Sequence, residues 1–118
     1  MKPKEILQQW IDLFNQGNSD EIVNLYHDDA INHQVANECV AGKDNIRKMF
    51  ASEFSNAKMT CIVENIFEDG EWVILEWIDP LGLRGCGFFH IVDNKIKFQR
   101  GYWDKLSFLK QHNLPIVS

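Results

Sequence analysis

The segment at residues 59–79, MTCIVENIFEDGEWVILEWID, decides the fold, because two extended stretches are joined there by Asp69-Gly70. Residues 59–68 and 72–79 are rich in β-branched and aromatic side chains, which favour strands. An Asp-Gly pair between two such stretches is a strong signal for a tight hairpin. The sequence therefore predicts an antiparallel pair of strands here.

The next 24 residues, 80–103, repeat this pattern. Pro80 and Gly82 mark a turn, and the extended stretches 84–92 and 95–103 are joined through Asp93-Asn94. With the first hairpin, they predict a four-strand antiparallel meander.

The residues before the meander have the period of helices. Pro3 can open a first helix and Gly17 can end it, since Pro suits the first helical position and Gly the position after the last turn. Ser19 begins a second, short helix, and residues 43–55 form a third after Gly42. Residues 30–35 are a short extended piece between them, and Asp104 caps a last helix. Helices and antiparallel strands that occupy separate parts of a chain predict an α+β fold.

Composition narrows the class of protein. The chain has 118 residues, which predicts a single domain over 1–118, with 45% hydrophobic residues, four Trp and eight Phe. So many large rings predict either a bulky core or a cavity lined with aromatic side chains. The net charge of −5 and the scattered Lys and Arg argue against nucleic-acid binding. No apolar run is long enough to span a bilayer, and the N-terminus is not typical of a signal peptide.

The cysteines indicate the redox compartment. Cys39, Cys61 and Cys86 are odd in number and widely spaced, without a CxxC pair. This predicts reduced thiols in the cytoplasm and no zinc site. No set of His, Cys and carboxylates has the spacing of metal ligands, so no metal and no cofactor are expected.

Several motifs carry a family resemblance over nearly the whole chain. They are Asn15-Gln-Gly17, the run Leu25-Tyr-His-Asp-Asp-Ala30, the ending that leads to Tyr102-Trp-Asp104, and Phe108-Leu-Lys-Gln111. In this order, the chain resembles the nuclear transport factor 2-like superfamily and its SnoaL-like members. The resemblance implies a cone made of a curved antiparallel sheet wrapped by helices around an apolar pocket, and often a homodimer through the outer face of the sheet. Members include steroid isomerases, epoxide hydrolases, polyketide cyclases and binding proteins, so the fold alone does not choose an activity.

The residues that carry catalysis in two of these groups are absent. At the positions that match the steroid-isomerase site, this chain has Trp10, Gln34 and Gly87. Gln34 cannot act as a base and Gly87 has no side-chain donor.

At the positions that match the epoxide-hydrolase site it has Trp77, Asp79 and Gly101, so only Asp79 remains. Arg100 is adjacent to the last position, but neighbouring strand residues face opposite sides of a sheet. A cyclase needs only one acidic group, which Asp79 or Asp104 can supply.

The candidate catalytic residues are therefore Asp79 and His33. Asp79 alternates with Trp77 along one strand, so it either borders the pocket or forms a turn before Pro80. His33 lies on the short extended piece, where it serves either as a base near neutral pH or as a hydrogen-bonded rim residue. The candidate ligand-binding residues, for which a role in the core is the alternative, are Trp10, Phe14, Tyr26, Gln34, Phe50, Phe54, Trp77, Arg100 and Trp103.

Three hypotheses on function follow. The first is a protein that binds a small apolar or polycyclic molecule in its pocket. The second is an isomerase, cyclase or epoxide-hydrolase-type enzyme that uses Asp79 or His33 as acid and base. The third is a dimerising interaction module.

Overall fold

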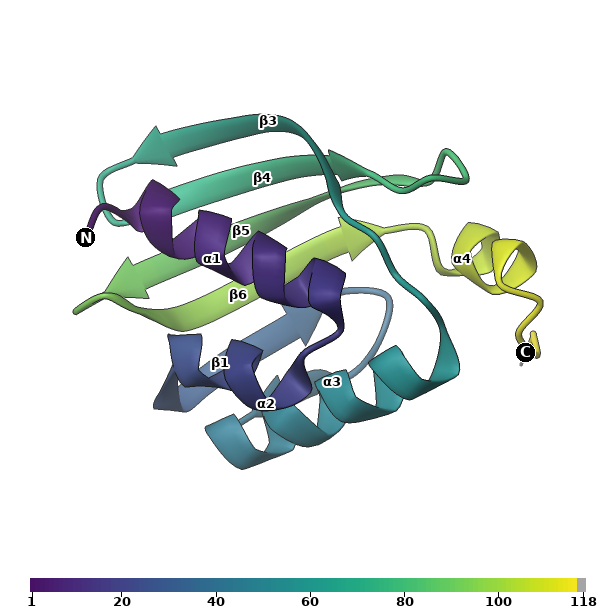
Figure 1. Cartoon of the computed structure of the whole chain (residues 1–118), viewed down its shortest axis with the longest axis horizontal. Coiled ribbons are helices and arrows are strands. Elements are labelled where there is room, and N and C mark those ends of the chain that lie inside the picture. Colours follow the sequence, from purple (N-terminus) through teal and green to yellow (C-terminus); the bar gives the residue numbers. More distant parts are fainter. Residues whose placement is uncertain (117–118) are drawn as a thin grey trace.

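The computed structural model describes residues 1–116, and it has one layer of helices packed on one mixed sheet (Figure 1). The helices are α1 (Pro3–Gln16), α2 (Ser19–Ile22), α3 (Lys43–Asn56) and α4 (Lys105–Gln111), with a short 3-10 turn, η1 (Val23–Leu25), after α2. The strands are β1 (Tyr26–Gln34), β2 (Cys39–Ala41), β3 (Ile62–Asp69), β4 (Trp72–Ile78), β5 (Arg84–Val92) and β6 (Lys95–Trp103). The α+β class, the four strands of the meander and the order of helices are confirmed.

The sheet is not wholly antiparallel, which corrects one expectation. Its strand order is β2-β1-β6-β5-β4-β3, and β1 pairs with β6 in parallel while every other neighbouring pair is antiparallel. A parallel pair needs a long connection between its strands. Here the connection contains α3 and the three strands β3 to β5, so it could not be read from local sequence patterns. Strand β2 has three residues and was not predicted.

The two hairpins turn as their residue types require. Asp93 and Asn94 both have positive φ, 50° and 64°, as in a type I′ turn, which confirms the predicted turn. In the first hairpin Asp69 still pairs with Trp72, so the two-residue loop is Gly70-Glu71, one residue later than expected. Gly70 has φ of 60°, which suits the first central position of a type II′ turn.

The helix ends follow the predicted capping residues. Gly17 is left-handed, with φ of 66°, and its N–H donates to carbonyls of the last turn of α1. Asp104 accepts a hydrogen bond from the Ser107 N–H at the start of α4. These caps explain why α1 ends and α4 begins where the sequence indicates.

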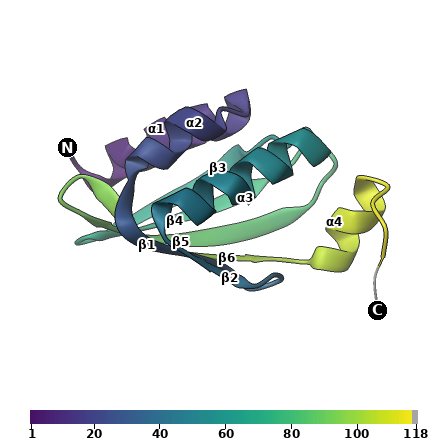
Figure 2. The same ribbon diagram turned by 90° about the horizontal axis from the view of Figure 1, so that it is seen from below.

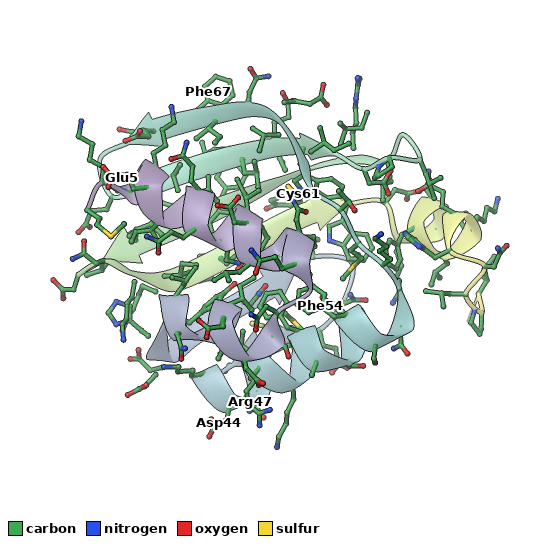
Figure 3. The ribbon with its side chains drawn as sticks, viewed as in Figure 1. Glu5, Asp44, Arg47, Phe54, Cys61 and Phe67 are labelled. Carbon is green, nitrogen blue, oxygen red and sulfur yellow. The ribbon has the colours of Figure 1, made fainter. Side chains whose placement is uncertain are left out.

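Helices α1, α2 and α3 cover one face of the sheet, and within residues 1–116 the opposite face carries no helix (Figure 2). Side chains of α1 and α3 meet those of the inner face in an apolar core, where the Trp10 ring centroid lies 5.1 Å from that of Phe89. Figure 3 adds the side chains to the view of Figure 1 and labels Phe54 on α3 and Phe67 on β3. No helix within residues 1–116 is long and apolar enough to cross a membrane.

Candidate functional site

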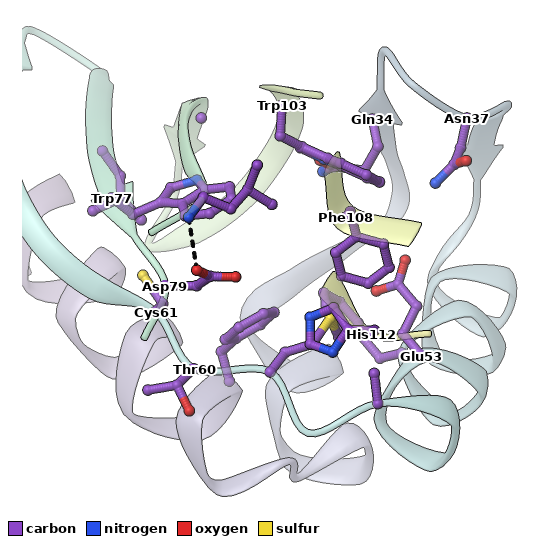
Figure 4. A pocket seen from close by; sticks show the side chains of 18 of the residues that line it. Gln34, Asn37, Glu53, Thr60, Cys61, Trp77, Asp79, Trp103, Phe108 and His112 are labelled. Carbon is purple, nitrogen blue, oxygen red and sulfur yellow. Dashed lines mark hydrogen bonds between the residues drawn. The ribbon is translucent and has the colours of Figure 1, made fainter. Parts of the chain in front are cut away.

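A cavity of about 510 Å³ lies between the helices and the inner face of the sheet. Helices α1 and α3 supply one side, strands β1, β4, β5 and β6 supply the other, and α4 with the segment 57–61 borders it as well (Figure 4). Two glycines of the inner face, Gly87 and Gly101, border the cavity and let neighbouring side chains approach the backbone closely. A Cβ on Gly87 would lie 3.2 Å from the Phe89 ring, and one on Gly101 would lie 2.0 Å from Gln34 Oε1.

Aromatic rings form most of the apolar wall. Three of the four tryptophans, Trp10, Trp77 and Trp103, border the cavity, whereas Trp72 stacks on His90. Trp103 also contacts Phe108 of α4, with ring centroids 5.2 Å apart. The predicted residues that border the cavity are Trp10, Phe14, Gln34, Phe50, Trp77, Asp79 and Trp103.

Two predicted residues lie behind the wall. Tyr26 is fully buried, and its hydroxyl takes part in hydrogen bonds to Trp10 and Gln99. Phe54 stacks on Phe50 with ring centroids 5.5 Å apart. These two side chains shape the cavity without bordering it.

The expectation that His33 and Arg100 belong to the pocket is wrong. Arg100 Nε donates to His33 Nδ1 over 3.3 Å, and Arg100 Cζ lies 4.8 Å from the centre of the Phe98 ring. Side chains alternate along a strand. Since Asn32 and Gln34 on β1 face the cavity, His33 faces the other side, and Arg100 likewise lies between the inward Gln99 and Gly101.

Asp79 combines the two roles that the sequence left open. It borders the cavity next to Trp77 (Figure 4). Its Oδ1 also accepts the N–H groups of Leu81, at 2.9 Å, and Leu83, at 2.8 Å. One carboxylate oxygen is therefore committed to holding the turn after β4.

Glu53 is an acidic group that the sequence reasoning missed. It lies on α3 and borders the cavity, where Figure 4 shows it among the lining side chains. Burial raises the pKa of its carboxyl to about 7, because an apolar setting disfavours the charged form. A signal existed in the sequence. Glu53 is seven residues after Ile46 and three after Phe50, so it falls on the apolar face of the predicted helix.

A chain of hydrogen-bonded polar side chains forms the floor of the cavity. Asn32 and Gln99 are both buried, with exposed fractions of 0% and 4%, and both border the cavity. Gln34 links Asn32 to the Trp103 indole, and Tyr26 links Gln99 to the Trp10 indole. Only Gln34 and Tyr26 of the four central residues were predicted. Asn32 and Gln99 could have been noticed as polar residues at inward positions of their strands.

Metal binding finds no support in the described part of the chain, since no three His, Cys, Asp or Glu side chains of residues 1–116 are placed to hold an ion. The cysteines do not pair. Cys61 is buried at the cavity, and burial raises the pKa of its thiol to about 11. A thiol with so high a pKa is mostly protonated at neutral pH and therefore a poor nucleophile.

Comparison with known proteins identifies the family and the fold. The sequence model of the SnoaL-like domain family matches residues 7–99. None of the curated proteins matches the chain.

Several solved structures share the whole architecture. One is a hypothetical protein with a ketosteroid isomerase-like fold from Catenulispora acidiphila, in complex with trimethylamine (TM-score 0.84, 17% identity, covering 98% of this chain and 96% of that one). A putative polyketide cyclase from Xanthomonas campestris also has a TM-score of 0.84, with 15% identity over 93% of this chain and 96% of that one. The epoxide hydrolase/cyclase-like enzyme SalBIII, from polyether salinomycin formation, has a TM-score of 0.78 and 21% identity over 88% of this chain and 92% of that one. At these identities the likeness shows the fold.

Proposed function

The chain belongs to the SnoaL-like domain family, and from its cavity we propose that it binds a small, largely apolar molecule. The observation that carries this proposal is the space of about 510 Å³ with aromatic walls and a short polar floor. Ligand pockets in proteins typically measure about 300–1,000 Å³ and are mostly apolar, with a few placed polar groups. A core that had collapsed on its own side chains would leave no such space.

A neutral apolar dye, N-phenyl-1-naphthylamine, tests this proposal. We expect its fluorescence to rise on binding to the wild-type protein. Met49 and Lys48 are neighbours on α3, but Met49 borders the cavity and Lys48 is exposed. Met49→Trp places a bulky indole ring in the cavity and is expected to weaken dye binding at least tenfold. Lys48→Trp is expected to leave dye binding unchanged. Equal binding by the two variants, or no binding by the wild type, contradicts a ligand cavity.

Proton transfer is a second candidate function, and Glu53 is the observation that favours it. A carboxyl group with a pKa near 7 suits either proton donation or proton removal at neutral pH. The neighbouring structures described as a putative polyketide cyclase and as an epoxide hydrolase/cyclase-like enzyme are consistent with such chemistry. His33 no longer qualifies, because it faces away from the cavity. Asp79 remains a weaker candidate, since its Oδ1 already holds a turn.

The step that we propose for Glu53 is removal of a proton from a carbon next to a carbonyl group. The C–H bond breaks, the proton passes to the Glu53 carboxylate, and the electron pair moves into an enolate. Return of a proton to the same or a neighbouring carbon completes exchange or isomerisation. Glu53→Gln is the variant that tests this candidate, because it keeps the shape of the side chain and cannot carry the proton.

The outer face of the sheet supports a third proposal, that two copies of this chain form a homodimer. The strand register places aromatic and aliphatic side chains side by side on this bare face, including Phe67, Ile74, Phe88, Phe98, Trp72 and Tyr102. Phe67 is 56% exposed and Tyr102 is 44% exposed. Monomers seldom leave a large contiguous apolar patch in water, and a two-fold dimer can cover one patch with its own copy.

Light scattering tests the dimer. We expect the wild-type protein to have twice the 13.8 kDa mass of one chain. Tyr102→Glu puts a charge on the outer face and is expected to give the monomer mass. Leu106→Glu is the control, because Leu106 is equally exposed, at 46%, but lies on α4. A wild-type protein that scatters as a monomer contradicts the proposal.

A further inference from the structure

The donor-to-acceptor order of the hydrogen bonds in the polar floor is fixed, because the chain of bonds begins at two side chains that can only donate. The indole N–H of tryptophan is a donor without acceptor capacity. Trp103 Nε1 lies 2.9 Å from Gln34 Oε1, and Trp10 Nε1 lies 3.0 Å from Tyr26 Oη. Each of these indoles therefore determines which atom of its neighbour accepts and which is left to donate.

The hydrogen bonds that start at Trp103 continue along β1. Gln34 uses its oxygen to accept from the indole, so its amide nitrogen donates to Asn32 Oδ1 over 2.8 Å. Asn32 must then present its own nitrogen to Gln99, and Asn32 Nδ2 lies 3.2 Å from Gln99 Oε1. Rotation of the Gln99 amide by 180° would set two nitrogen donors against each other.

The hydrogen bonds that start at Trp10 identify the same atom of Gln99 as the acceptor. The Tyr26 hydroxyl accepts from the indole and donates its one hydrogen to Gln99 Oε1. Burial raises the pKa of the Tyr26 hydroxyl, so it remains neutral and keeps that hydrogen. Two independent chains of donors thus end on the same oxygen atom of Gln99.

The nitrogen of the Gln99 amide, Nε2, is left without an acceptor within residues 1–116. In that part of the chain Gln111 Oε1 is the one side-chain nitrogen or oxygen that is both fully buried and without a partner. Gln99 Nε2 therefore keeps contact with open space, and the open space that its residue borders is the cavity. The residue as a whole is only 4% exposed, so this donor lies deep in the protein.

We propose that the Gln99 amide nitrogen anchors the ligand by donating a hydrogen bond to a carbonyl or ether oxygen on an otherwise apolar skeleton. This inference rests on the proposed binding function and specifies which class of molecule the cavity takes. The two hydrogen bonds accepted by Oε1 polarise the amide and strengthen its N–H groups as donors. A ligand without an acceptor leaves this donor without a partner in a dry site, which lowers its affinity.

Camphor and its parent hydrocarbon camphane test the anchor, since they share one skeleton and differ in a single carbonyl group. Displacement of the bound dye gives both dissociation constants. We expect the wild-type protein to bind camphor about fivefold more tightly than camphane, the effect of one hydrogen bond. Gln99→Glu keeps an acceptor for Tyr26 and Asn32 and replaces the cavity-facing nitrogen with oxygen. Ionisation of this carboxyl removes its donor hydrogen, so we expect the preference for camphor to disappear as the pH is raised to 8.5 and above.

The control variant is Gln8→Glu, which makes the same chemical change on an exposed position of α1. It should keep the preference for camphor. The ratio of the two dissociation constants also separates the outcomes. If the wild-type protein does not bind the dye, the proposed function falls and the anchor with it, whereas bound dye that neither compound displaces overturns the anchor alone. If both displace it equally well, or if Gln99→Glu keeps the preference, the cavity binds ligands and the anchor is wrong.

A measurement on the wild-type protein covers the case in which Gln99→Glu does not fold. The side-chain NH₂ signals of Gln99 in a ¹⁵N-labelled sample report directly on the hydrogen bond. We expect camphor to move them downfield and camphane to leave them nearly in place. Signals that respond alike to the two compounds overturn the proposal without any substitution.

Discussion

Replacing Glu53 by Gln is expected to slow proton exchange by about 100-fold, the usual contribution of a positioned acid or base. Camphor in D₂O provides the assay, because a base in the cavity removes a proton from the carbon next to its carbonyl and deuterium replaces it. Mass spectrometry follows the uptake. Asp79→Asn is the matched variant, since it changes the other carboxylate of the cavity and is expected to keep most of the exchange. Wild-type protein that does not accelerate exchange over buffer excludes proton transfer of this kind.

The same Glu53→Gln substitution is expected to change how stability depends on pH. The carboxyl of Glu53 has a pKa of about 7 in the folded protein and an ordinary value of 4.5 in the unfolded chain. Between these values the folded state holds a proton that the unfolded state has lost, so the free energy of unfolding falls as pH rises through this window. The loss is at most about 3 kcal/mol, and contact of the side chain with solvent reduces it.

Denaturant unfolding at pH 4.5 and pH 8 measures this effect. The variant lacks the titrating group, so the difference in stability between the variant and the wild type isolates Glu53 from all other ionisable residues. We expect the variant to gain relative stability at pH 8. A difference that is the same at the two pH values means that Glu53 has an ordinary pKa in the folded protein.

Replacing Gly85 by Ala is expected to destabilise the protein by about 3 kcal/mol, near the upper end for overpacking of a core. A Cβ at this position would lie 2.4 Å from the Trp77 ring and 2.7 Å from the backbone oxygen of Tyr102. The Tyr102 oxygen belongs to a sheet ladder and cannot move away, so that contact remains strained. The contact with Trp77 is relieved only if the ring leaves its place in the cavity wall. Thermal unfolding should show a midpoint lowered by more than 10 °C.

Gly87→Ala is the control for Gly85→Ala, because it makes the same change two residues further along β5. Its Cβ would meet the edge of the Phe89 ring at 3.2 Å, and a small ring shift relieves that contact. We expect a loss of about 1 kcal/mol or less. If the two variants lose the same stability, the close approach of Trp77 to the backbone is not what Gly85 serves.

Much of the fold could be predicted because local residue types determine it. The turns and caps depend on a residue's own backbone conformation or on a hydrogen bond to a neighbour a few residues away. This holds for Asp93-Asn94, Gly17 and Asp104, so the sequence is sufficient to predict them. The parallel pairing of β1 with β6 depends on contacts between residues far apart in the sequence. No local pattern encodes such a pairing.

The sequence was sufficient to predict most of the aromatic residues that border the cavity, but fewer of its polar residues. Alternation along β4 correctly placed Trp77 and Asp79 on the cavity. The expectation that both His33 and Gln34 face the cavity conflicts with alternation along a strand, which excludes one of the two. Glu53 was missed because a carboxylate on a helix is normally read as a solvent-facing residue. Its pKa depends on burial in the folded protein, which the helix sequence alone does not show.

The hydrogen bonds of the polar floor that link β1 to β6 join residues that are remote along the chain. Asn32 and Gln99 are 67 positions apart, and Gln34 and Trp103 are 69 apart. Hairpins such as β3–β4 close short loops and can form early, whereas contacts across so long a loop form only after its entropy cost has been met. We therefore expect the floor to be completed late in folding, and partly folded chains in which β1 has not docked on β6 to have no floor to which a ligand could bind.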